Sequence, residues 1–97
     1  MKIALNITYD GYKLPDEFFV THKDKDYREY KYGDTIKSRT DPDVISFIES
    51  YGPDGYIGIL THIIVVDIPD DATDATLFMR YGGEMIAYFQ DGKMHMI

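Results

Sequence analysis

The stretch DPDVISFIESYGP, residues 41–53, carries the clearest structural signal of the chain. Asp41 is a favourable N-cap, and Pro42 is a favourable first helical residue because the N–H that proline lacks would be unpaired there anyway. The apolar positions that follow repeat with the helical period: Val44, Ile45, Phe47, Ile48 and Tyr51. A Gly-Pro pair then stops the run. The pattern predicts an amphipathic helix over residues 42–51.

The most hydrophobic segment, residues 59–68, follows this helix closely. Its apolar side chains fall on both sides of an extended chain, which is typical of a central strand that is covered on both faces. One helix covers only one face of a sheet, so a second cover is required. We expect that cover to be a short helix over residues 15–22, which contains Phe18 and Phe19, or another subunit. A homo-oligomer is therefore expected.

Two-residue turns mark the C-terminal part of the chain. Residues 75–81 and 85–90 have the composition of strands and are joined by a Gly-Gly pair. An Asp-Gly pair then leads into residues 93–97. Such pairs between alternating segments are strong hairpin signals.

The N-terminal half is less regular. Residues 2–9 alternate, with Ile3, Leu5 and Ile7 on one side, which predicts a half-buried strand. Residues 27–32 carry charges on both faces and are expected to form an edge strand or an extended loop, with residues 33–39 as a connection. The whole pattern predicts one α+β domain: an antiparallel sheet of about four or five strands with the main helix packed on one face.

Composition excludes several classes of protein. The 97 residues suffice for one domain, and the absence of cysteine excludes disulfides, thiol catalysis and thiolate metal sites. The formal net charge of −7 opposes direct binding to nucleic acid. No apolar stretch is long enough for a signal peptide or a membrane span, so a soluble, cytoplasmic domain is expected.

Catalytic signals are missing. The three histidines stand too far apart in sequence to suggest a metal site, and the chain has no nucleophile elbow, phosphate-binding loop or dinucleotide fingerprint. We therefore expect neither an enzyme nor a cofactor. One enzymatic alternative stays open, a small hydrolase that holds a divalent cation on paired acids: Asp41, Asp43, Asp70 and Asp71.

Tyrosine and arginine are the residue types that most suggest a binding site. The chain has nine tyrosines, whose rings can stack on a base, and three arginines, whose planar forks suit phosphate. Two simpler interpretations compete. The tyrosines can serve as amphipathic filler on a small sheet, and each arginine can form a surface ion pair with one of the abundant acids.

Short motifs along the chain resemble those of a family of small, uncharacterised proteins encoded by bacteriophages. The N-terminal motif comprises Lys2, Ile3, Asn6, Tyr9, Gly11, Tyr12 and Leu14. The central motif comprises Arg39, Asp41 and Pro42, and a later strand end comprises Val66, Ile68, Pro69 and Asp70. A last turn comprises Tyr81, Gly83 and Glu84. Asp10 stands where a glycine is common, and the family's charged, tryptophan-ended tail is absent.

This resemblance implies a phage accessory protein that acts in the host cytoplasm and counters host antiviral defence. The first hypothesis is sequestration of a nucleotide-derived immune signal by a homo-oligomer. Its expected ligand-binding residues are Asn6, Tyr9, Tyr12, Arg39, Arg80 and Tyr81. The alternative is direct inhibition of a host protein, with the acidic, tyrosine-rich surface meeting a basic groove.

Overall fold

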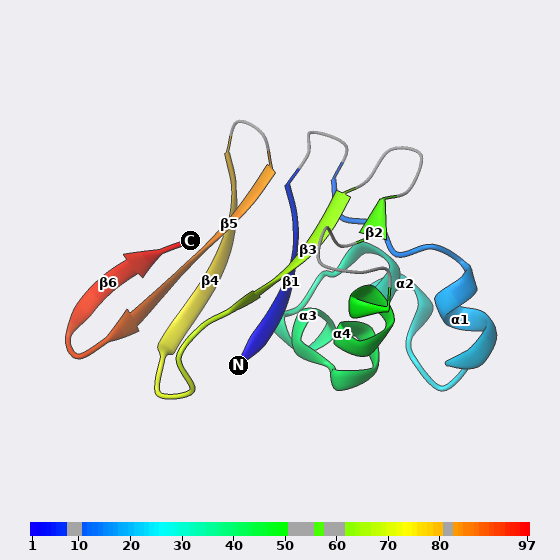
Figure 1. Cartoon of the computed structure of the whole chain (residues 1–97), viewed down its shortest axis with the longest axis horizontal. Coiled ribbons are helices and arrows are strands. Elements are labelled where there is room, and N and C mark those ends of the chain that lie inside the picture. The colour runs from blue at the N-terminus through cyan, green and yellow to red at the C-terminus, as the bar shows by residue number, and fades with distance from the viewer. Residues whose placement is uncertain (8–10, 51–55, 58–61, 81–82) are drawn as a thin grey trace.

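The computed structural model describes residues 1–7, 11–50, 56–57, 62–80 and 83–97, which form four helices and six strands (Figure 1). The helices are α1 (Glu17–Thr21), α2 (Tyr27–Tyr32), α3 (Ile36–Thr40) and α4 (Pro42–Glu49). The strands are β1 (Lys2–Asn6), β2 (Tyr56–Ile57), β3 (His62–Asp67), β4 (Thr73–Arg80), β5 (Gly83–Gln90) and β6 (Lys93–Met96). None of the helices in these ranges is long and apolar enough to cross a membrane.

The strands form two antiparallel sheets. The first has the order β1-β3-β2, with Leu5 opposite Ile64, and the second has the order β4-β5-β6, with Tyr88 opposite His95. The predicted α+β class with antiparallel strands is confirmed, but the strands are divided between two sheets instead of sharing one. The division has a physical cause, described below: side chains, not a further strand, satisfy the outer edge of β1.

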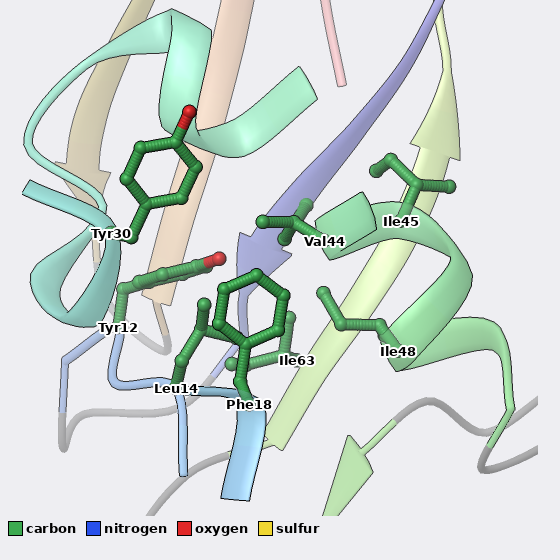
Figure 2. Close-up of a cluster of buried hydrophobic side chains, with 9 residues drawn as sticks. Tyr12, Leu14, Phe18, Tyr30, Val44, Ile45, Ile48 and Ile63 are labelled. Carbon is green, nitrogen blue, oxygen red and sulfur yellow. The ribbon is translucent and has the colours of Figure 1, made fainter. Parts of the chain in front are cut away.

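The predicted helix over residues 42–51 is confirmed as α4, although residue 51 lies outside the described part of the chain. Asp41 caps it, and its side chain accepts a hydrogen bond of 2.9 Å from the N–H of Asp43. The helix buries its apolar face against the first sheet. Figure 2 shows this core, with Phe18 of α1 among Leu14, Val44 and Ile48.

A second core lies between the two sheets. Its buried members are Ile3, Leu5, Ile68, Ile86 and Tyr88. Strand β1 is therefore buried on both faces, since Ala4 enters the first core while its neighbours enter the second. The expectation that only one face of this strand is buried is therefore wrong. Ile7, expected on the same side as Ile3 and Leu5, is 40% exposed.

The second sheet also supplies the cover that the hydrophobic segment requires. Val65 of β3 packs against the first core, and Val66 packs against the second. The expectation that α1 or another subunit would cover the second face is wrong: Phe18 of α1 joins the first core, on the side of α4, and the second sheet covers the other face.

Two further expectations are wrong. Residues 27–32, expected as an edge strand or loop, form α2, and residues 36–39 of the expected connection belong to α3. Local caps explain both helices. The side chain of Asp26 accepts a hydrogen bond of 2.8 Å from the N–H of Glu29, and Thr35 and Ser38 form a reciprocal capping box at the start of α3.

Candidate functional site

The two sheets meet where the end of β1 lies against the start of β5. Gly83 stands at this point with a φ of +132°, a conformation that suits glycine. A Cβ atom there would lie 2.6 Å from the carbonyl oxygen of Asn6 and 2.6 Å from the backbone of Ile7. The backbones approach too closely for any side chain, so this junction requires glycine.

Arg39 enters the junction from α3 and is 3% exposed. Its Nη1 and Nη2 atoms each donate a hydrogen bond of 2.6 Å to the carboxylate of Glu84, so the pair is bidentate. The Nε atom donates to the carbonyl of Gly33 at 2.8 Å, and Nη1 also donates to the carbonyl of Ala4 at 3.1 Å. The guanidinium thus makes four hydrogen bonds inside the protein, to one carboxylate and two backbone carbonyls.

Glu84 completes this arrangement from β5. Besides Arg39, its Oε1 atom accepts a hydrogen bond of 2.7 Å from the N–H of Asn6. At the outer edge of β1, the Ala4 carbonyl therefore accepts a hydrogen bond from Arg39, and the Asn6 N–H donates one to Glu84. The ion pair takes the place of a neighbouring strand, and this is why the first sheet stops at β1.

Tyr12 covers the ion pair from the side. The guanidinium carbon of Arg39 lies 3.7 Å from the centroid of the Tyr12 ring, within the range of a cation–π interaction. The ring is 6% exposed, and its hydroxyl has no hydrogen-bond partner among the described residues. The hydroxyl points among the core side chains (Figure 2), and burial raises the pKa of Tyr12 well above its usual value.

Three of the six expected ligand-binding residues meet in this junction: Asn6, Tyr12 and Arg39. All three are buried, and the carboxylate of Glu84 fills the fork of Arg39 that a phosphate would use. Arg39 does pair with an acid, as the simpler interpretation expects, but the pair is buried and does not lie on the surface. Tyr9, Tyr81 and the side chain of Arg80 lie outside the described part of the chain.

Glu84 is the site residue that the sequence reasoning missed. Glu84 follows Gly83 in the turn motif near the C-terminus. The N-terminal motif contributes Asn6 to the junction, the central motif contributes Arg39, and the turn motif contributes Glu84. Their convergence required the fold, because 45 residues separate Arg39 from Glu84.

The acids proposed for a hydrolase lie in two separate places. Asp41 and Asp43 each contact the ammonium of Lys25 at 3.0 Å. Burial acts to raise the pKa of Asp41, but the pKa is lowered overall because the N–H of Asp43, Lys25 and Tyr30 all stabilise the carboxylate. Within the described ranges, no three His, Asp or Glu residues are grouped so that they could hold a metal ion.

A second candidate surface is the face of the second sheet that points away from the core. The strand register places a set of apolar side chains on this outer face: Phe78, Met85, Ala87, Phe89, Met94 and Met96. Phe89, Met94 and Met96 are 37%, 61% and 44% exposed. Helix α3 contacts β4 as well as the first sheet, and no helix in the described part of the chain lies beside β5 or β6 (Figure 1).

Comparisons with known protein families, with curated proteins and with solved structures found no match to this chain.

Proposed function

We propose that this chain acts by binding a protein partner through the outer face of its second sheet. The observation that carries the proposal is the set of apolar side chains on this face, of which Phe89, Met94 and Met96 are exposed. The register also places Thr73, Thr76 and Arg80 on this face, at the strand that borders the apolar set. Isolated exposed apolar residues are ordinary, but a contiguous apolar patch on a small domain marks an interaction surface.

The chemistry of the patch favours a protein over a small ligand. The large apolar side chains of this sheet face are methionines and phenylalanines. Methionine side chains are flexible and adapt to partner surfaces of different shape, whereas phenylalanine supplies a large apolar area. Such a composition suits the centre of a protein–protein interface, where charged residues are depleted.

The resemblance to small phage proteins suggests the class of this partner, a host protein of antiviral defence. The net charge of −7 would help to steer the chain toward a basic surface around an apolar patch. The rate of association should then fall as the ionic strength rises, while the apolar contact should hold the complex together.

The test replaces Phe89 and Met94 with serine and compares partner binding. Val20 on α1 offers a matched control, because it is an apolar residue that is 67% exposed outside this face. A partner captured from host lysate is purified, and its affinity is measured against the wild type, the double variant and Val20→Ser. We expect the double variant to bind at least about tenfold more weakly and the control to bind as the wild type does. Equal binding by the double variant would contradict the proposal.

Sequestration of a nucleotide-derived signal is the second candidate. Its support is the sequence, in which tyrosine is frequent and Tyr9 and Tyr81 belong to the motifs that resemble those of small phage proteins. Thermal unfolding in the presence of cyclic and linear nucleotides tests this candidate, since a ligand at about 100 times its Kd adds about 2.7 kcal/mol of stability. An unchanged melting temperature with all of them would remove its support.

A further inference from the structure

The two sheets have four outer strand edges, and three of them are protected against pairing with another chain. The edge of β1 is satisfied by Arg39 and Glu84. Strand β2 has two residues, which is too short to template a ladder. Strand β4 is irregular, with a register shift between Thr73 and Thr76 and a φ of +53° at Asp74.

The fourth edge belongs to β6, where the described residues show neither a bulge nor side chains that satisfy the outer backbone groups; its one lysine, Lys93, stands at the first position of the strand. Strand β6 pairs regularly with β5 over Lys93–Met96, without a bulge or a proline, and no described strand lies on its other side. Ile86 and Ile97 exchange two backbone hydrogen bonds of 3.1 and 3.0 Å. This pair determines which residues of β6 direct their N–H and C=O groups toward β5 and which direct them outward. It follows that the N–H and C=O groups of Met94 and Met96 point away from β5.

We propose that β6 of a second copy of this chain pairs antiparallel with this edge. A two-fold axis that places His95 opposite its counterpart sets Met94 opposite the partner subunit's Met96. The outward N–H of Met94 then donates to the outward C=O of the partner subunit's Met96, and the C=O of Met94 accepts from the N–H of the partner subunit's Met96, as an antiparallel ladder requires. The two second sheets become one sheet of six strands.

The side chains of β6 fit this pairing. Met94 and Met96 share the outer face, so apolar side chains lie beside apolar side chains across the axis. The strand contains no acid, although the chain carries seventeen. Two copies of a chain with a net charge of −7 can thus approach along an edge where acidic side chains do not face each other.

Pairing at this edge leaves the outer face of the second sheet uncovered and roughly doubles the area of that face in the dimer. The inference goes beyond the proposed binding of a protein partner and does not depend on it. Four residues per copy bury much less area than a standard protein–protein interface. We therefore expect a weak dimer, with a dissociation constant in the micromolar range.

Sedimentation equilibrium of the whole chain tests the proposal. The fraction of dimer should rise with concentration from the low micromolar to the near-millimolar range. Met94→Pro removes an outward N–H that β5 does not use, and an edge position tolerates proline, so this variant should dimerise at least about tenfold more weakly. Met94→Thr keeps the N–H and should dimerise to a similar extent as the wild type. A wild type that stays monomeric, or a proline variant that dimerises as the wild type does, would overturn the proposal.

Hydrogen exchange gives a second test that needs no variant. In the dimer, the amide protons of Met94 and Met96 are bonded to the partner subunit, so their exchange should slow by at least about tenfold as the protein concentration rises. Fast exchange that does not change with concentration would also overturn the proposal. Neither measurement uses a host partner, so failure of the proposed function and failure of the dimer remain distinguishable.

Discussion

Arg39 and Glu84 form a bidentate ion pair, with two hydrogen bonds of 2.6 Å, whose side chains are only 4% and 8% exposed. The pair joins α3 to β5 and bonds to the edge of β1 on the way. It therefore connects the helical layer, the first sheet and the second sheet at one point. Because both charges are removed from water, each depends on the other for its stability inside the protein.

Breaking this pair should destabilise the fold strongly. We expect Arg39→Met or Glu84→Gln to lower the free energy of unfolding by about 3–5 kcal/mol, because each leaves a buried polar group without its partner. The double variant should lose less than the sum of the two single losses, since it removes both charges together. Urea unfolding measures all three variants.

The exposed ion pair between Lys2 and Glu49 is the control for this prediction. Its two side chains are 50% and 46% exposed, so Glu49→Gln should leave the unfolding midpoint almost unchanged. A loss of the same size at both pairs would show that the buried position of Arg39 has no special importance.

The junction also predicts a difference between two glycines. A Cβ at Gly83 would meet the backbone of Asn6 and Ile7, and backbone cannot move aside as a flexible side chain can. Gly83→Ala should therefore cost about 2–4 kcal/mol, from backbone strain plus overpacking. Gly92 also has a positive φ, +73°, but a Cβ there meets nothing within 4 Å. Gly92→Ala should cost only the strain, about 1–2 kcal/mol. Equal losses in urea unfolding would contradict this account of the junction.

Local signals predicted those parts of the fold that local interactions determine. Helix α4 begins at its proline after the Asp41 cap, as the sequence indicates. The Asp-Gly pair between β5 and β6 makes the expected tight turn, with φ values of +55° and +73°. In both cases, neighbouring residues supply the required hydrogen bonds or backbone conformations.

The division into two sheets could not be predicted in this way. It depends on a buried ion pair between residues 39 and 84, which nothing in the local patterns connects. Helix α2 was missed for a related reason. Its charges on both faces suggested exposure, yet Lys31 is buried because it forms an ion pair with Asp16, and Tyr30 is 3% exposed. Lys31 and Tyr30 are buried because they bond to residues outside the helix, so the sequence of α2 alone does not show which of its faces is buried.

The stability of the fold should decline as the pH falls through the acidic range. The pKa of Asp41 is lowered in the folded chain, as are the pKa values of Asp16 and Asp70. A carboxylate whose folded pKa is lowered contributes stability above its unfolded pKa and loses it as the pH falls through the folded value. The free energy of unfolding should thus decrease from about pH 5 to about pH 2.

Asp41→Asn separates the contribution of Asp41 from the others. Asparagine is also a good N-cap, so the variant keeps the helix start but loses the charge that faces Lys25. Its unfolding free energy should be lower than that of the wild type at pH 7 and should converge with it near pH 2. Parallel curves over the whole range would contradict the assignment.

Two buried tyrosines should respond in opposite directions when each loses its hydroxyl. The Tyr12 hydroxyl is buried without a partner among the described residues, so Tyr12→Phe removes an unpaid desolvation penalty and should raise the free energy of unfolding by about 1 kcal/mol. The ring remains, and with it the contact to Arg39. By contrast, the Tyr30 hydroxyl donates a hydrogen bond of 2.8 Å to Asp41.

Tyr30→Phe should therefore lower the free energy of unfolding by about 1.5–3 kcal/mol, the range for a hydrogen bond to a charged acceptor. Burial and the bond to Asp41 both raise the pKa of Tyr30, to about 12, so its hydroxyl is protonated and able to donate at neutral pH. Urea unfolding of the two variants side by side gives the comparison. If Tyr12→Phe proved as damaging as Tyr30→Phe, the Tyr12 hydroxyl would have a stabilising partner, and the junction beside Arg39 would be a polar site that holds a further group.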